Sequence, residues 1–202
     1  YVGYRYYQTA HKPVAFPFGY GLSYTSFAYS DLAATAEGVT LTVTNTGSCA
    51  GDEIVQLYVA KPDAEVFRPE QELKGFARVH LEAGESRTVT IPLDDKAFRY
   101  WNMKTDRWEV EGGRYQLRVG ASSADIRLTA EVTVEGTGAA DPYAGADLPH
   151  YRTGEVTAAT DAEFAALLGR PIPENRVRID RNITLGELSH GRSPLGWLVA
   201  AV

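Results

Sequence analysis

The sequence contains little sulfur and no long apolar run. Its 202 residues include one methionine and one cysteine, Cys49. A single cysteine excludes an internal disulfide framework and a cysteine-rich zinc module. The missing disulfide favours the cytoplasm over secretion. Because no run of 18 apolar residues occurs, we expect no transmembrane helix and no membrane partner.

Clustered basic residues and metal-ligand patterns are also missing. The formal net charge is −6, which argues against a nucleic-acid partner, because such proteins concentrate Lys and Arg. The histidines are scattered and show no ligand spacing; they are His11, His80, His150 and His190. No Gly-x-Ser-x-Gly nucleophile motif is present. We therefore predict no metal site and no cofactor.

Paired carboxylates were the remaining catalytic candidates, since glycosidic chemistry uses two of them. The candidate pairs are Asp52 with Glu53, Asp94 with Asp95, and Glu70 with Glu72. All lie at the edges of predicted strands or in turns, where acidic residues serve solubility. We therefore predict no catalytic residue in this chain.

The middle of the chain alternates between apolar and polar residues with a period of two. Such alternation places one face of a strand in a core and the other face in solvent. Turn residues such as Asn45-Thr-Gly47 separate the runs. About seven strands result, covering residues 39–43, 54–59, 73–79, 89–93, 98–101, 115–119 and 126–134. Their spacing predicts an all-β fold, an antiparallel β-sandwich of immunoglobulin or fibronectin type III-like architecture.

Residues 1–30 are rich in aromatic side chains and poor in regular periodicity. Ten of the 30 are Tyr or Phe, interrupted by several glycines and prolines. An exposed aromatic surface of this extent would promote aggregation. Two interpretations are open: the segment packs on its own domain, or it forms the seam to a neighbouring domain. Because the chain starts at Tyr1 and stops within an apolar run, we expect a piece of a larger protein.

The C-terminal part, residues 137–202, carries helix signals instead of strand signals. Thr160-Asp-Ala-Glu163 is a capping box that opens a short helix, and Gly169 with Pro171 ends it. Thr184-Leu-Gly-Glu187 is a second box, and Ser193-Pro194 is a third helix start. We predict a linker followed by a short helical C-terminal appendage, too small to form its own core.

Three aromatic residues flank a turn in the second half of the chain: Tyr100, Trp101 and Trp108. Exposed together and coplanar, their rings would make a platform on which a sugar ring stacks. The alternative interpretation buries them in the sandwich core, which is expected most of all for Trp108.

Several segments closely resemble the C-terminal region of family 3 glycoside hydrolases, notably β-glucosidases. One specific string is Phe16-Pro-Phe-Gly-Tyr-Gly-Leu-Ser-Tyr-Thr25. The segments Gly51–Val59, Leu73–Phe76 and Leu81–Glu85 look like the fibronectin type III-like domain of that family. The resemblance covers roughly residues 1–135, and residues 148–173 resemble more weakly an extension of some bacterial members.

This resemblance implies a division of the chain and a function. Residues 1–30 would end an α/β sandwich domain, with a final strand at 1–8, and cross over to the β-sandwich at 31–136. In that family the nucleophile and the acid/base belong to other domains, so the chain would be a non-catalytic fragment bracing the catalytic domains of a retaining β-glucosidase. The implied interface comprises Tyr4, Tyr6, Tyr7, Phe16, Pro17, Phe18, Gly19, Tyr20, Gly21, Leu22 and Tyr24. The alternatives are a module for protein interaction or self-assembly, forming a homo-oligomer through these residues, and a weak carbohydrate-binding module.

Overall fold

The structure, a computed structural model, describes residues 1–173 and 184. The chain divides into two compact units, residues 1–159 and residues 160–202. Except for Thr184, the second predicted capping box and the helix start at Ser193 lie outside the described residues.

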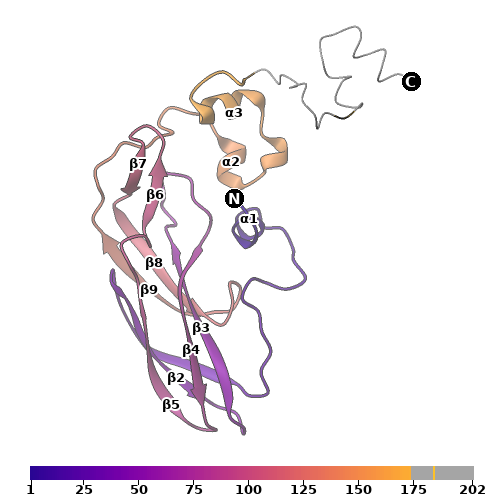
Figure 1. The fold of residues 1–202 in the computed structure, drawn as a ribbon, viewed down its shortest axis with the longest axis vertical. Coiled ribbons are helices and arrows are strands. Elements are labelled where there is room, and N and C mark those ends of the chain that lie inside the picture. Colours follow the sequence, from indigo (N-terminus) through magenta and orange to yellow (C-terminus); the bar gives the residue numbers. More distant parts are fainter. Residues whose placement is uncertain (174–183, 185–202) are drawn as a thin grey trace. The chain divides into compact units, whose positions relative to one another are not determined.

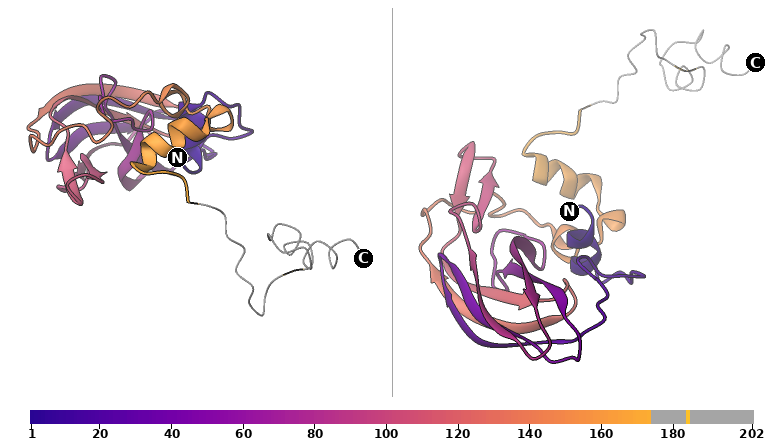
Figure 2. Two further views of the ribbon diagram at one scale, coloured as in Figure 1. Left: turned by 90° about the horizontal axis from the view of Figure 1, so that it is seen from above. Right: turned by 60° about the horizontal axis from the view of Figure 1, so that its bottom comes forward.

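Two antiparallel sheets form the body of the first unit (Figures 1 and 2). The three-stranded sheet has the order β1 (Phe27–Thr35), β2 (Gly38–Asn45), β5 (Ser86–Pro92). The four-stranded sheet has the order β4 (Glu72–Leu81), β3 (Gly51–Ala60), β8 (Gly113–Gly120), β9 (Ile126–Val134). A separate hairpin consists of β6 (Arg99–Asn102) and β7 (Arg107–Val110). The predicted β-sandwich is thus confirmed.

The core lies between the two sheets and follows the period-2 pattern of the sequence. Alternate residues of β2 are almost completely buried, and β5 and β8 contribute in the same way. The central members are Val39, Leu41, Val43, Val55, Leu57, Leu81, Ile91, Tyr115, Leu117 and Val119. Burying one such side chain contributes about 1.5–3 kcal/mol, so this cluster is the main source of stability for the sandwich.

Strand β1 was not predicted, because a β-bulge breaks its alternation. The pairing of β1 with β2 shifts between Ser30 and Ala33. Asp31, inside the bulge, has a positive φ of 55°. The shift moves the inward positions from Tyr29 to Leu32, so a search for unbroken alternation misses the strand.

The chain opens with a helix, not with the strand implied at residues 1–8. Helix α1 (Tyr4–Thr9) begins at Gly3, whose carbonyl accepts from the amides of Tyr6 and Tyr7. A strand is stable only when a neighbour pairs with its backbone. Within the described part of the chain no strand pairs with these residues, and the local hydrogen bonds of a helix satisfy the backbone instead.

Short helical elements follow the sandwich. Helix α2 (Pro149–Thr153) and the 3₁₀ turn Val156–Ala158 belong to the first unit. In the second unit, α3 (Asp161–Leu168) has the predicted capping box: Thr160 Oγ1 accepts from the Glu163 amide, and the Glu163 side chain accepts from the Thr160 amide. Gly169 ends α3 in the left-handed conformation, as predicted.

The side chain of Asn45, the last residue of β2, links neighbouring backbone segments, so its substitution should destabilise the domain. It is completely buried. Its Nδ2 donates to the carbonyls of Cys49 and Leu81, at 2.9 and 3.1 Å, and its Oδ1 accepts from the Gly47 amide at 3.0 Å. We expect Asn45→Ala to lower the free energy of unfolding by about 2–4 kcal/mol, because buried polar groups lose their partners.

Urea denaturation checks this expectation, with Thr44→Ala as the matched control. Thr44 Oγ1 forms an exposed hydrogen bond with Ser86 Oγ, so its loss should change stability by less than about 1 kcal/mol. Equal effects of the two substitutions would contradict the role assigned to Asn45.

Candidate interdomain interface

Residues 10–26, here called the crossing segment, connect α1 to β1 and are attached to the sandwich through their backbone and the Thr25 side chain. The Phe18 carbonyl accepts from the Ser123 amide at 2.9 Å. The Gly19 carbonyl accepts from Gln56 Nε2 at 3.0 Å. At the end of the segment, Thr25 Oγ1 donates to the buried Asn45 Oδ1 at 2.6 Å. These bonds fix the path of the segment without burying its aromatic side chains.

Gln56 is the principal anchor, and it lies on the outer face of β3. Its Nε2 also donates to the Ala121 carbonyl at 2.6 Å, while its Oε1 accepts from the Tyr58 hydroxyl at 2.6 Å. Both Gln56 and Tyr58 are buried. Gln56 is not among the functional residues predicted from the sequence, although a polar residue inside the apolar run 54–59 is an available signal.

Helix α1 covers the same outer face through Tyr4. The Leu73 amide donates to the Tyr4 hydroxyl at 2.7 Å. The Tyr4 ring stacks on Phe18, with centroids 4.3 Å apart and planes 15° apart, and meets Tyr58 edge to face at 6.2 Å. Burial raises the pKa of the Tyr4 phenol. The neighbouring Arg5 pairs with Glu72 at 2.9 Å, so polar and aromatic contacts together fix α1.

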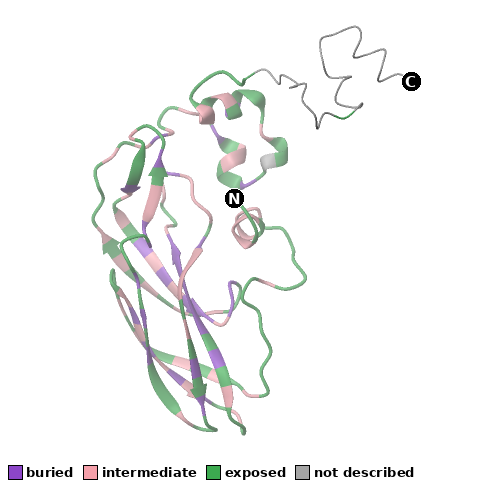
Figure 3. Cartoon of the chain, in the orientation of Figure 1, coloured by how far each residue is buried: buried purple, intermediate pink, exposed green. Residues whose placement is uncertain are grey.

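The aromatic side chains of the crossing segment point outward. Figure 3 shows the loop after α1 as mostly exposed. Tyr24 is fully exposed and Leu22 is 89% exposed. Of the eleven predicted interface residues, Tyr4, Tyr6 and Pro17 are half-buried, and Tyr7, Phe16, Phe18, Gly19, Tyr20, Gly21, Leu22 and Tyr24 are exposed. The backbone of the segment thus packs on its own domain, while most of its aromatic side chains are exposed. The seam to a neighbouring domain stays a prediction.

An apolar groove lies between α1 and the crossing segment. It has a volume of about 430 Å³ and is lined by Tyr4, Tyr7, Val14, Phe16 and Phe18, among others. Large exposed apolar patches are typical of protein–protein contacts.

The candidate carboxylates do not form an acid–base pair. On β3, Asp52 pairs with Arg78 at 2.9 Å, whereas its neighbour Glu53 accepts from the Tyr29 hydroxyl at 2.7 Å. Successive residues of a strand point to opposite faces, so these two groups diverge. Three of the others face cations: Glu70 lies 3.5 Å from Arg118, Glu72 pairs with Arg5 and Lys74, and Asp95 pairs with Arg99. Asp94 Oδ1 instead accepts from the Lys96 amide at 2.9 Å.

Among the described residues, 1–173 and 184, no group of three or more His, Cys, Asp or Glu side chains could hold a metal ion. No helix in that range is long and apolar enough to cross a membrane. Cys49 is exposed, and its thiol donates to the Tyr24 carbonyl.

The two tryptophans of the β6–β7 hairpin are exposed, so the core interpretation of Trp108 is wrong. Trp101 and Trp108 are direct cross-strand partners and are 46% and 57% exposed. Their rings are 5.5 Å apart and inclined by 77°. The coplanar arrangement expected of a flat platform is therefore absent, because directly opposed tryptophans meet edge to face here.

Comparison with known proteins adds the family context. Residues 53–123 match the model of the fibronectin type III-like domain. The sandwich is a fibronectin type III-like domain. The exo-α-(1→6)-L-arabinopyranosidase of Bifidobacterium breve is 50% identical over 147 residues, covering 70% of this chain and 19% of that enzyme. The thermostable β-glucosidase B of Acetivibrio thermocellus is 47% identical over 145 residues, covering 68% and 19%.

Two solved structures that are similar to this chain are β-glucosidases. The family 3 β-glucosidase of Bifidobacterium adolescentis is 38% identical, covers 98% of this chain and 24% of its own, and superposes with a TM-score of 0.65. The β-glucosidase of Kluyveromyces marxianus, solved with glucose, is 48% identical over 66% of this chain, with a TM-score of 0.63. This chain spans about a fifth of the curated relatives' length, and its fibronectin-like domain matches the C-terminal region of family 3 glycosidases.

Gly19 should be irreplaceable in the crossing segment. Its φ is +78°, and an added Cβ would lie 2.0 Å from Gln56 Oε1. We expect Gly19→Ala to break the Gly19–Gln56 contact and to accelerate hydrogen exchange at the Ser123 amide, which bonds to Phe18. Gly21→Ala is the control, since nothing lies within 4 Å of its added Cβ. Unchanged exchange in the Gly19 variant would contradict this anchor.

Glu53 should make stability depend on pH. Burial raises its pKa above the ordinary 4.5. Because the folded pKa exceeds the unfolded one, ionisation of Glu53 opposes folding, and stability is lost as the pH rises from about 4.5 through the folded pKa. We expect the Tm of Glu53→Gln, relative to the unsubstituted chain, to rise between pH 4 and pH 7. Melting curves of the exposed Glu37→Gln provide the control, and a pH-independent difference for Glu53→Gln would refute the expectation.

Proposed function

We propose that this chain is a non-catalytic structural module of a family 3 exo-glycosidase, and that its crossing segment braces the catalytic domains of that enzyme. The observation that carries the proposal is the outward aromatic surface: hydrogen bonds to Gln56 and Ser123 hold the backbone, while side chains such as Tyr24 and Leu22 stay exposed. Because hydrogen bonds already hold the backbone of the segment, less backbone entropy is lost when a partner docks.

The relatives support the choice of enzyme class. They are named as β-glucosidases and exo-arabinopyranosidases, and the match occupies 17–24% of each. Both names describe hydrolysis of glycosides. We propose that the parent of this chain is a retaining β-glucosidase acting on terminal β-glucosides, with its two catalytic carboxylates in other domains. The candidate carboxylates of this chain support that division, because they face cations, a tyrosine or, for Asp94, a backbone amide.

A second function has its own support. The same exposed side chains could be covered by a second copy of this chain, since self-complementary apolar patches form homodimers. That function predicts association that depends on the concentration of this chain alone. Sedimentation equilibrium distinguishes it from bracing, which predicts a monomer that binds the other domains.

Binding in trans tests the bracing role. The parent polypeptide truncated before Tyr1 is mixed with this chain, and calorimetry measures the affinity. We expect a Kd in the micromolar range or tighter, no turnover of p-nitrophenyl β-glucoside by this chain alone, and turnover that rises when the two parts are mixed.

Variants identify the surface responsible. Tyr24→Ser should weaken binding at least about tenfold, because aromatic anchors dominate interfaces. Phe76→Ala is the matched control, since Phe76 is an exposed aromatic residue of β4 outside the crossing segment. No binding at micromolar concentrations, or equal losses in both variants, would refute the bracing role.

A further inference from the structure

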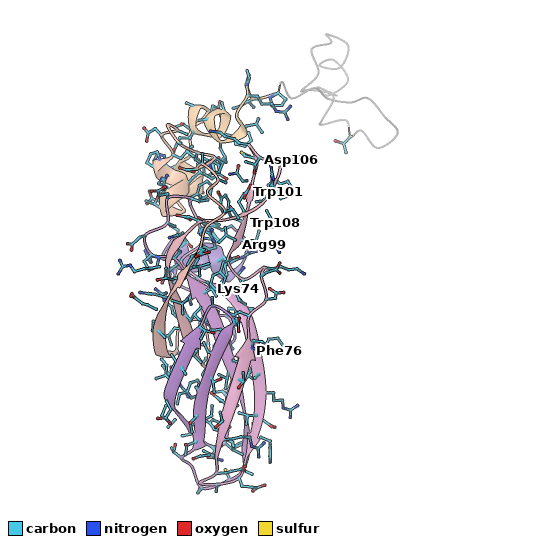
Figure 4. The ribbon with its side chains drawn as sticks, turned by 90° about the vertical axis from the view of Figure 1, so that its left-hand side faces the viewer. Lys74, Phe76, Arg99, Trp101, Asp106 and Trp108 are labelled. Atoms are coloured by element: carbon cyan, nitrogen blue, oxygen red, sulfur yellow. The ribbon has the colours of Figure 1, made fainter. Side chains whose placement is uncertain are left out.

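A second surface of the sandwich domain combines aromatic and cationic side chains. It is a cleft of about 710 Å³ between the segment Phe67–Pro69, β4 and the β6–β7 hairpin. Figure 4 shows Lys74, Arg99, Trp101 and Trp108 projecting on the same side of the domain. Its size is within the range of small-molecule sites, about 300–1,000 Å³. None of the crossing-segment residues lines it.

The aromatic part of the cleft is a corner. Trp101 and Trp108 both line it, and their ring planes are inclined by 77°. One ring offers a face and the other an edge, so a flat ligand can stack on the first while contacting the second. About half of each side chain is exposed, although burial of such surface is strongly favourable. The corner therefore fits a ring-shaped ligand with an apolar face.

The polar part of the cleft consists almost entirely of hydrogen-bond donors. Five cationic side chains line it: Arg5, Arg68, Lys74, Lys96 and Arg99. Lys and Arg donate and never accept. The single lining carboxylate, Glu72, already pairs with Arg5 and Lys74 at 2.9 and 3.2 Å. A ligand of this cleft must therefore be rich in acceptors.

The charge balance of the cleft selects an anion. Arg68 pairs with Glu111 at 3.3 Å, and Arg99 pairs with Asp95. With Glu72, three carboxylates thus face five cations, and the local surplus is positive in a chain whose net charge is −6. Within the described residues no salt bridge involves Lys96. A carboxylate brought to this cleft would meet an available ammonium group.

We propose that this cleft binds an acidic glycan, a chain of uronic acid residues. A pyranose ring supplies the flat apolar face for the tryptophan corner, its hydroxyls accept from the donors of the rim, and its carboxylate pairs with Lys96. A neutral sugar leaves the positive charge unmatched, and an acidic peptide leaves the corner without a ring. No residue of the crossing segment lines the site, and its role in this proposal is attachment of the enzyme to an anionic polysaccharide.

Calorimetric titration of the full chain tests the proposal with three matched probes: tetragalacturonate, its methyl ester and tetraglutamate. We expect tetragalacturonate to bind, and the ester, which keeps the rings and loses the charge, to bind at least about tenfold more weakly. Tetraglutamate, which keeps the charge and lacks rings, should be weakened similarly. Raising the salt from 50 to 300 mM should weaken tetragalacturonate binding, because Lys96, the proposed partner of its carboxylate, is exposed to solvent.

Variants of the cleft complete the test. Trp101→Ala should weaken tetragalacturonate binding at least about tenfold, and Lys96→Gln should weaken it and reduce its salt dependence. Phe76→Ala and Lys104→Gln are controls, because neither residue lines the cleft. Should Trp101→Ala fail to fold, Trp108→Ala takes its place. Binding unaffected by the tryptophan variant, equal binding of tetraglutamate, or no binding at millimolar ligand would overturn the proposal.

Discussion

The buried amide of Gln56 is the contact on which the functional arrangement of this domain depends. It uses its donors for the carbonyls of Gly19 and Ala121 and its acceptor for the Tyr58 hydroxyl. One side chain thereby joins the crossing segment, the loop between β8 and β9, and the central strand. Leaving such a group unpaired would cost about 1–3 kcal/mol, so the segment is held to the outer face of β3 by a polar constraint.

Because of that constraint, the groups that attach the crossing segment differ from the groups that can contact a partner. The segment is held through carbonyl groups of its backbone, as at Phe18 and Gly19, so its side chains remain available for a partner. At the tryptophan cleft, by contrast, the side chains of a regular hairpin form the surface, and cationic side chains surround it. The two surfaces differ in chemistry, one nearly uncharged and one cationic, so they suit different partners.

The sandwich could be predicted from the sequence, because apolar and polar residues alternate with a period of two where one strand face is buried. Residues 39–43 and 115–119 alternate and do lie in strands of the core. Strand β1 was not predicted, because the bulge at Asp31 reverses the alternation of apolar and polar residues. The exposure of Trp108 and the role of Gln56 could not be predicted, since both depend on which distant segment covers a strand face. Helix α1 replaced an implied strand because pairing is a tertiary property.

The stability of the sandwich and the exposure of its aromatic surface are compatible because they depend on different groups. The core lies between the sheets and includes none of the eleven interface residues. Substituting Tyr24 or Leu22, which are almost fully exposed, removes no buried contact, so the folded state should lose little free energy. Folding therefore places little constraint on the side chains of Leu22 and Tyr24, whereas Tyr4, Phe18 and Gly19 also contact the rest of the domain.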